Sequence, residues 1–296
     1  MKLSLIIPVY NRLQLLEKCM LSVCKQVLPP DEIILSDDGS TEDILQFYRK
    51  QKQLCGIPLK LVRQDHTEFR AARVRNNGVS VSEGDLLVFI DQDIIIPPLY
   101  LTTVVACIRA DRFLSAYPVR LSEAQSEQVD TAAIESNSYL SYVLPTQKAK
   151  IRRQFREDYI SYLLCRFAKL RSHGAKLRSG VSAIMRTDYE KVNGYDENFV
   201  GWGGEDDDLG RRLLAIGKVG YNFGNSCYPL HLYHEPNHEN YQRVNTPYSL
   251  SAKKAIGKKN YRCKIGLDTK RDDVVSYQDS DDNTTLSFPR RRESSP

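Results

Sequence analysis

The chain has 296 residues, enough for one large α/β domain or two modest ones with a full hydrophobic core. Its 42 Lys and Arg against 37 Asp and Glu give a net charge of +5, too weak to indicate a nucleic-acid-binding protein. No apolar run approaches the roughly 20 residues of a transmembrane helix, and residues 1–12 lack a signal-peptide cleavage pattern. The seven cysteines are scattered, without C-x-x-C spacing, which is typical of a protein in a reducing cytoplasm.

The first hundred residues alternate strand and helix patterns. Hydrophobic periodicity and punctuation predict strands at 3–9, 32–35, 59–62 and 85–90, and helices at 11–27, 41–52 and 69–81. Asn11 is expected to cap the first of these helices. This alternation predicts right-handed crossovers and a mostly parallel sheet with helices on both faces. In such a sheet, ligands bind beyond the carboxyl ends of the strands.

Later segments are more mixed. We predict helices at 97–109, 151–171, 188–192 and 206–216, and strands at 114–119 and 179–185. Ten Lys or Arg against two acids give residues 147–178 a local net charge of +8, suited to phosphates, an anionic membrane or an acidic glycan. Residues 249–296 are Lys-rich and then Asp-rich, and we expect most of them to be disordered.

Acidic residues follow two of the predicted strands. Asp91 and Asp93 come directly after the apolar run DLLVFI, where two carboxylates can chelate a divalent cation that also holds a diphosphate. A turn with helix-capping acids explains a lone D-x-D equally well, but the position after the fourth strand favours the metal. Asp37 and Asp38 end the second strand, where a carboxylate can accept hydrogen bonds from a base or ribose; an N-cap cluster is the alternative.

Basic residues and histidines add further candidates. Arg70, Arg73 and Arg75 lie on one predicted helix near the same edge and can face phosphates, although a solvated helix face explains one or two of them. His231, His234 and His238 lie within eight positions. One imidazole would complete a carboxylate-rich metal site, and all three cannot bind one ion.

The segment GWGGEDDDLGRR (201–212) places four consecutive acids beside the only tryptophan. Trp202 can stack on the apolar face of a sugar, and a carboxylate can accept a proton from an attacking hydroxyl. The alternative is the acidic first turn of a helix, which the helix dipole stabilises. That alternative accounts for some of the acids but not for the Gly-Trp-Gly-Gly.

Taken together, these motifs resemble a known family. IIPVYNR, LSDDGST and AARVRNNGVSVSEGDLLVFIDQD are similar to the family 2 glycosyltransferases, which have the GT-A fold, an α/β architecture with a Rossmann-like, mostly parallel central sheet. NGYDENFVGWGGEDDDLGRRL resembles the C-terminal galactosyltransferase-type module of β-1,4-galactosyltransferases and bacterial chondroitin-type polymerases. The likeness covers roughly residues 1–118 and 179–243.

The resemblance implies roles for particular residues. Asp206 would be the catalytic base, with Trp202 and Glu205 binding the acceptor. Asp93 would bind Mn²⁺ or Mg²⁺ together with His234, which matches the family element better than His231 does. Ser182 departs from the family, which often has Asn at that position. The implied nucleotide-binding residues are Pro8, Tyr10, Asp38, Arg75, Asn76 and Asp91.

The implied function is an inverting, metal-dependent transfer of a hexose or N-acetylhexosamine from a UDP-sugar to a sugar hydroxyl of a glycan or lipid-linked glycan. Residues 1–118 would bind the donor, 119–178 form a basic helical insert, and 179–248 bind the acceptor and catalyse transfer. The insert's residues 148–178 suggest peripheral contact with the inner face of a membrane. A catalytically silent nucleotide- or glycan-binding protein is the alternative. A nucleotidyltransferase would need a glycine-rich, basic phosphate loop, which PVYNRLQLL is not.

Overall fold

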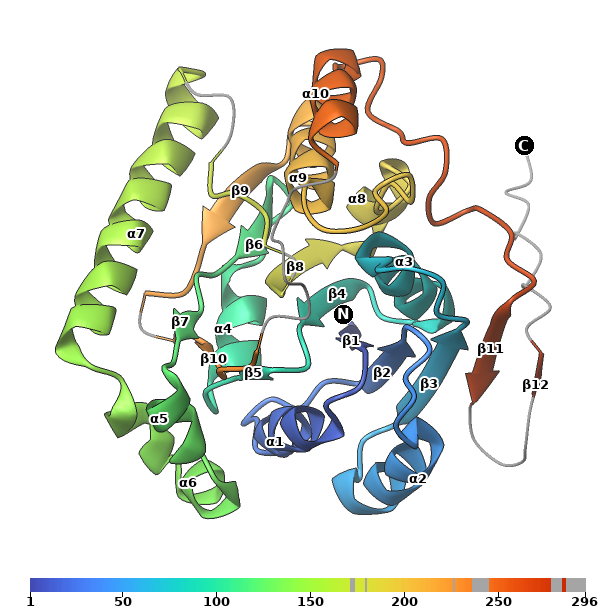
Figure 1. The fold of residues 1–296 in the computed structure, drawn as a ribbon. Helices are drawn as coiled ribbons and strands as arrows, with labels where there is room; N and C mark the ends of the chain where they lie inside the picture. Colours follow the sequence, from blue (N-terminus) through green and yellow to red (C-terminus); the bar gives the residue numbers. More distant parts are fainter. Residues whose placement is uncertain (171–173, 179, 226, 236–244, 278–283, 286–296) are drawn as a thin grey trace.

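The computed structural model describes residues 1–170, 174–178, 180–225, 227–235, 245–277 and 284–285 (Figure 1). In this part of the chain the main sheet has the strand order β12-β11-β3-β2-β1-β4-β8-β6-β9. The four central strands β3, β2, β1 and β4 are parallel, and β8 and β11 run antiparallel to their neighbours β4 and β3. The bounds are β1 Leu3–Val9, β2 Glu32–Asp37, β3 Leu59–Gln64, β4 Leu86–Ile90, β6 Arg112–Ser115, β8 Val181–Met185, β9 Val219–Asn222, β11 Val274–Tyr277 and β12 Thr284–Thr285.

Helices cover both faces of this sheet, as the alternating pattern predicts (Figure 1). One hydrophobic cluster joins the sheet to α1 (Leu13–Cys24), α2 (Ile44–Cys55) and α4 (Tyr100–Cys107). A second cluster joins the opposite face to α3 (Ala71–Val81), α8 (Arg186–Lys191) and α9 (Glu205–Ala215). The fold is therefore a three-layered α/β architecture.

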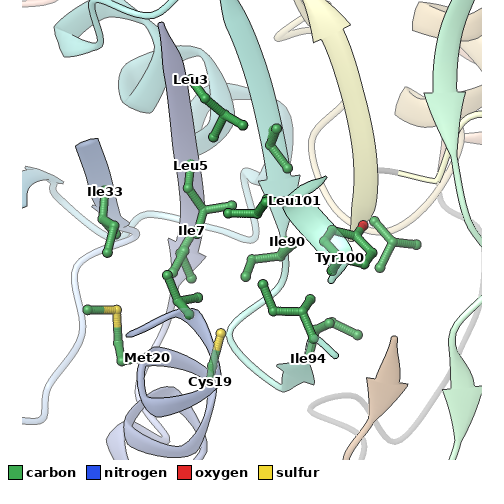
Figure 2. Packing of buried hydrophobic residues seen from close by; sticks show 14 of the residues in the cluster. Leu3, Leu5, Ile7, Cys19, Met20, Ile33, Ile90, Ile94, Tyr100 and Leu101 are labelled. Atoms are coloured by element: carbon green, nitrogen blue, oxygen red, sulfur yellow. The ribbon is translucent and has the colours of Figure 1, made fainter. Parts of the chain in front are cut away.

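Strand β1 shows why both faces are covered. Its side chains alternate between the two faces, so Leu5 and Ile7 enter one cluster and Ile6 enters the other, all with no exposed surface. Figure 2 shows Ile7 packing toward Met20 and Cys19 of α1, and Leu5 packing toward Leu101 of α4. A continuous apolar run is what a strand buried on both faces requires.

A second, three-stranded sheet lies beside the main one. It has the order β5-β10-β7, with β5 at Ile94–Ile95, β10 at Leu230–His231 and β7 at Val119–Arg120. Its apolar side chains share a third hydrophobic cluster with the segment 129–151. Because β10 pairs antiparallel with β5, it brings His231 next to the acids that follow β4.

The segment between β7 and β8 is mostly helical. Helix α7 (Pro145–Leu163) is the long outer helix at the left of Figure 1, and a π-helical turn, Leu164–Ala168, continues it. It begins earlier than predicted because Pro145 occupies the first turn and the side chain of Gln147 accepts the N–H of Leu144. The shorter elements are α5 Glu123–Glu127, α6 Thr131–Ser136 and the 3₁₀ helix Ser138–Tyr142.

Part of the C-terminal segment is ordered, which corrects the prediction of disorder for residues up to 277. Helix α10 spans Thr246–Ala255, and β11 pairs with the edge of β3. The side chains of Arg271 and Glu197 form a buried ion pair. The prediction failed because this polar segment gains its order from partners far away in the sequence. Residues 278–283 and 286–296 lie outside the described residues.

Two smaller expectations also need correction. Asn11 does not cap α1; its side-chain oxygen accepts the backbone N–H groups of Thr41 and Glu42 and so joins the β1–α1 loop to the β2–α2 loop. Cys24 and Cys55 form a disulfide between α1 and α2, where reduced cysteines were expected; the other five cysteines are free. In both cases the partner is remote in sequence and close in space.

Candidate functional site

A cavity of about 1000 Å³ opens at the carboxyl ends of β1, β2 and β4. This is the edge of a parallel sheet at which ligands are expected. The structure brings nine of the candidate residues from the sequence to its lining, although they come from six separate parts of the chain. These are Pro8, Tyr10, Asp38, Arg75, Asp91, Asp93, Trp202, His231 and His234.

One wall of the cavity offers a flat aromatic surface beside an acid. The rings of Tyr10 and His66 stack with centroids 4.4 Å apart, and His66 Nδ1 lies 2.9 Å from the backbone oxygen of Asp38. The side-chain amide of Gln64 donates to Asp38 Oδ1 at 2.6 Å, and burial raises the pKa of this carboxyl group. This wall can stack on a base and accept its hydrogen bonds. Sequence reasoning missed His66 and Gln64 because neither belongs to a motif.

Asp93, His231 and His234 form a group that can hold a metal ion. Asp93 Oδ2 lies 2.9 Å from His234 Nε2 and 3.6 Å from His231 Nε2, and one potential ligand atom from each residue lies within 4.8 Å of the others. Among the described residues, Asp93 Oδ1 is buried and has no hydrogen-bond partner. Burial raises the pKa of Asp93, but the imidazole of His234 outweighs this and holds it below its ordinary value. One carboxylate with two imidazoles fits Mn²⁺.

The small sheet explains how these three residues meet. In its register His231 lies opposite Ile94, one residue after Asp93, and the N–H of Leu232 donates to the backbone oxygen of Asp93 at 2.9 Å. His231, the less favoured histidine in the sequence, therefore joins His234 at this site. The signal in the sequence was the alternation in PLHLYH, which placed His231 on a strand. His238 lies outside the described residues.

His234 is oriented from its other side. Its Nδ1 lies 2.9 Å from Arg12 Nη1, and Arg12 also donates to the backbone oxygen of Glu235 at 2.6 Å. His234 Nδ1 also lies 3.0 Å from the backbone oxygen of Glu235, which can accept its N–H and leave Nε2 free for a metal ion. Arg12 lines the cavity as well, which sequence reasoning did not predict.

Arg75 connects the acids after β4 to the acids of α9. It is buried, its Nη2 lies 3.0 Å from Asp91 Oδ1, and its guanidinium lies 5.5 Å from the ring centroid of Tyr195. Tyr195 in turn donates its hydroxyl to Asp206 Oδ1 at 3.3 Å. Burial lowers the pKa of Arg75, but Asp91 and the other acids around it hold that pKa above its ordinary value. Asp206 is thus tied to the cavity wall through Tyr195 and Arg75.

Glu205 lies in the same charged group. Burial and the neighbouring carboxylate of Asp206 raise the pKa of Glu205 to about 7, although Arg75 acts in the opposite direction. Its Oε2 is buried without a hydrogen-bond partner in the described part of the chain. A buried polar atom without a partner is rare in folded proteins and marks Glu205 as a candidate functional residue.

The remaining two acids of GWGGEDDDLGRR stabilise the helix itself. Asp207 pairs with Arg211 at 2.8 Å, and Asp208 forms a buried pair with Arg212 at 2.7 Å. Arg212 also donates to the backbone oxygens of Val192 and Gly194, which lie at the start of the loop leading to this segment. The interpretation of this segment as the acidic first turn of a helix therefore holds for Asp207 and Asp208.

The glycines before these acids form a left-handed turn. Gly201, Gly203 and Gly204 have φ values of 81°, 93° and 105°, a region that residues with a side chain rarely adopt. A Cβ at Gly204 would also lie 2.8 Å from the ring of Phe199. This turn lets Trp202 line the cavity while Glu205 begins α9.

Glu205 and Asp206 do not line the cavity, and neither do three further candidates, Asn76, Arg73 and Ser182. Asn76 is fully buried and bonds to Tyr195 and Glu197, so the expectation that it lies at the nucleotide edge is corrected. Arg73 pairs with Asp273 of the C-terminal segment. Ser182 is buried within β8. Asn76 is misread from sequence because it adjoins Arg75 in α3 but points toward a different neighbour.

Two family profiles match the chain. Residues 4–173, more than half of the 296, match the profile described as glycosyl transferase family 2. Residues 161–235 match the profile described as the N-terminal domain of galactosyltransferase. The second match contains both histidines and the acids of α9.

Among curated proteins, the chain is similar to validoxylamine A glucosyltransferase from Streptomyces hygroscopicus subsp. limoneus, with 29% identity over 80% of this chain and 53% of the relative. It is also similar to chondroitin synthase from Pasteurella multocida, with 27% identity over 73% of this chain and 23% of the relative. The chain thus spans about half the length of the first and under a quarter of the second.

Solved structures show the same fold at lower identity. Staphylococcus aureus TarS 1–349 in complex with UDP-GlcNAc has a TM-score of 0.59 at 17% identity, covering 85% of this chain and 64% of that one. The mannosyltransferase PcManGT from Pyrobaculum calidifontis, in complex with GDP-Man and Mn²⁺, has a TM-score of 0.53 at 16% identity, covering 80% and 58%.

Proposed function

Because the chain belongs to glycosyl transferase family 2, we propose that it moves a hexose or N-acetylhexosamine from a UDP-sugar to a glycan hydroxyl, with inversion at the anomeric carbon. The chain is a glycosyltransferase with the GT-A fold. The identity of the donor, the identity of the acceptor and the inversion of configuration are our proposals. The proposal includes a division of labour, with residues 1–118 binding the donor and residues 179–248 binding the acceptor.

One observation supports this proposal above the others. A single cavity is lined by the stacking wall at Tyr10, the metal-binding group at Asp93 and the aromatic platform Trp202. These features suit a base, a diphosphate-bound metal and a sugar, in that order. A catalytically silent binder would not need the proposed base Asp206, which is linked to this cavity through Tyr195 and Arg75.

Asp93, His231 and His234 would hold Mn²⁺ or Mg²⁺. When bound there, the ion would neutralise negative charge on the departing diphosphate. The two imidazoles favour Mn²⁺ over Mg²⁺, because Mg²⁺ prefers oxygen ligands. Arg12 and Arg75, which also line the cavity, add fixed positive charge for the phosphates.

In the proposed step Asp206 takes the proton of the acceptor hydroxyl as that oxygen attacks the anomeric carbon. A new C–O bond forms on one face of the sugar, and the bond to the diphosphate oxygen breaks on the other, so the configuration inverts. Trp202 would stack on the acceptor ring. The unpartnered Oε2 of Glu205 would accept a hydrogen bond from a second hydroxyl of the acceptor. Tyr195 holds Asp206 in place for this step.

Similar proteins support the choice of substrates. One structural neighbour binds UDP-GlcNAc, another binds GDP-Man with Mn²⁺, and the relatives include a chondroitin synthase. We therefore propose a surface glycan, a polysaccharide or a lipid-linked glycan as the acceptor. The proposed cytoplasmic location rests on the five free cysteines, and the Cys24–Cys55 disulfide counts against it.

Replacing Asp206 by Asn tests the proposed base. We expect kcat for sugar transfer to fall by about 10²–10⁴-fold, the usual contribution of a general base, with little change in UDP affinity. The matched control is Asp207→Asn in the same helical turn, where the side chain pairs with Arg211; it should keep most of the activity. A panel of UDP-sugars with Mn²⁺, scored for UDP release and for the anomer formed, provides the measurement.

Other outcomes would overturn specific parts of the proposal. Near-wild-type turnover by the Asp206→Asn variant would remove Asp206 from the mechanism. Absence of metal-dependent UDP release with every donor and glycan acceptor would favour a silent binder. Release of pyrophosphate from UTP and a sugar phosphate would indicate a nucleotidyltransferase.

A further inference from the structure

Helix α7 and the turn that follows it present an outward face that is not covered by any of the residues that the structure describes. The helix packs on β9 through the opposite side, where Ile151, Asp158 and Tyr162 are buried. Asp158 accepts from the side chain of Asn222 at 2.8 Å, and the guanidinium of Arg112 lies between the rings of Tyr162 and Tyr221, 4.9 and 4.7 Å from their centroids. The inner side of α7 therefore has its partners within the fold.

The outward face carries charge at one end and apolar side chains at the other. Arg153 and Arg156 are followed at helical spacing by Ile160, Leu163 and Phe167. Ile160 is 50% exposed and Phe167 is 72% exposed. Leu170, just beyond the π-helical turn, is 76% exposed. Figure 1 shows this helix along the outer flank of the molecule, with one side free.

The charge around this face is strongly positive. Between residues 145 and 170 only two acids occur, Glu157 and Asp158, and Asp158 is buried. Seven Lys or Arg lie in the same range: Lys148, Lys150, Arg152, Arg153, Arg156, Arg166 and Lys169. Arg153 pairs with Glu157 and Arg166 with Asp111, and both arginines remain substantially exposed. Cations in this position are attracted to an anionic surface within a Debye length.

We propose that this face, residues 152–170, docks on an anionic lipid bilayer, with Ile160, Phe167 and Leu170 entering the headgroup region. A helix that binds in the plane of a membrane interface combines basic residues with exposed aliphatic and aromatic ones. From Arg153 to Phe167 the face is about 20 Å long, at 1.5 Å per residue. No helix in the described ranges is long and apolar enough to cross a membrane, so the contact would be peripheral.

A lipid surface fits this face better than a glycan or a protein does. An acidic glycan could bind the cations and the ring of Phe167. It would bury little of the apolar surface of aliphatic side chains such as Ile160 and Leu170. A second copy of this chain would bring the same positive charge against itself. The inference does not depend on the proposed UDP-sugar transfer, because none of these residues lines the cavity.

The test is co-sedimentation of the full chain with liposomes of phosphatidylcholine, with or without phosphatidylglycerol. We expect binding only when phosphatidylglycerol is present, and weaker binding at higher salt. Each cation near an anionic surface is worth roughly fivefold in binding, so removing three should weaken it by at least about tenfold. The two test variants are Arg152→Gln/Arg153→Gln/Arg156→Gln and Ile160→Ser/Phe167→Ser/Leu170→Ser.

The matched controls change the same kinds of exposed side chain elsewhere. They are Lys253→Gln/Lys254→Gln on α10 and Leu54→Ser/Leu250→Ser, with Leu54 69% and Leu250 56% exposed. Both should bind the liposomes as the wild type does. All variants should keep the wild-type circular dichroism spectrum, melting temperature and UDP affinity, because every altered side chain lies on the surface.

Several results would overturn the proposal. These are no binding to phosphatidylglycerol liposomes, equal binding to pure phosphatidylcholine, or equal loss in the test and control variants. Size-exclusion chromatography separates lipid from protein as the occupant. If the wild type is a dimer and the apolar variant a monomer, the face is an interface between copies of this chain and the lipid proposal is wrong.

Discussion

Glu205 carries a carboxylate whose pKa of about 7 follows from burial beside Asp206, only partly offset by Arg75. The ordinary value of 4.5 applies to the unfolded chain, so the folded protein binds the extra proton between these two values. Its free energy of unfolding should therefore fall as the pH rises from about 4.5 to about 7, and level off above that. Burial of this charge therefore lowers the stability of the folded protein at neutral pH.

Glu205→Gln should remove that cost. We expect the variant to be more stable than the wild type at pH 8 by about 1–3 kcal/mol, and equally stable at pH 4.5, because each pKa unit corresponds to about 1.4 kcal/mol. Urea unfolding at both pH values, with EDTA present, measures the difference. Replacement of the exposed Glu68 by Gln is the control. A difference between Glu205→Gln and the wild type that is the same at both pH values would contradict the argument.

The histidines at the cavity yield a second prediction at this scale. If both His231 and His234 bind the metal, His231→Ala and His234→Ala should each weaken Mn²⁺ binding in the presence of UDP by at least about tenfold. Calorimetry measures this directly. His66→Ala, measured at a UDP concentration that saturates each variant, is the matched control, because His66 stacks on Tyr10 and lies outside the Asp93–His231–His234 group. Unchanged Mn²⁺ affinity in the His231 variant would leave His234 as the sole histidine ligand.

Secondary-structure elements decide which residues of a motif act together. Helix α9 turns by 3.6 residues, so Glu205 and Asp206 begin it beside Arg75, while Asp207 and Asp208 each meet an arginine one turn later. The sequence indicated that a helix turn explains only some of the four acids, and the family resemblance singled out Glu205 and Asp206. It did not show that Arg212 also holds the backbone of Val192 and Gly194.

The two ion pairs of α9 should differ sharply in their importance. Asp208→Ala leaves Arg212 buried without its carboxylate, and we expect it to lower the free energy of unfolding by about 3–5 kcal/mol. Asp207→Ala removes a more exposed pair with Arg211 and should cost less than about 1 kcal/mol. Urea denaturation of both variants measures the contrast. Equal effects would mean that burial of Arg212 is not what matters.

At the scale of the whole molecule, two connections hold the cavity together. The short pairing of β5 with β10 brings His231 to Asp93 across nearly half of the chain. The C-terminal segment adds β11 to the edge of β3 and places Arg271 against Glu197, which also accepts from Asn76. This network supports the loop that leads to Trp202. Its residues are polar and carry no motif, and for this reason the sequence suggested disorder.

The sequence by itself determined the alternating α/β elements, the mostly parallel sheet and the edge of that sheet at which Tyr10, Asp38 and Asp93 lie. Local hydrophobic periodicity is enough for the elements, and parallel topology then places strand ends together. Only the tertiary structure decided that His231 joins the group that can hold a metal ion, that Asn76 turns away from the cavity and that residues 249–277 are ordered. These outcomes depend on contacts between residues far apart in the chain, and a local pattern in the sequence carries no information about which remote partner a side chain will meet.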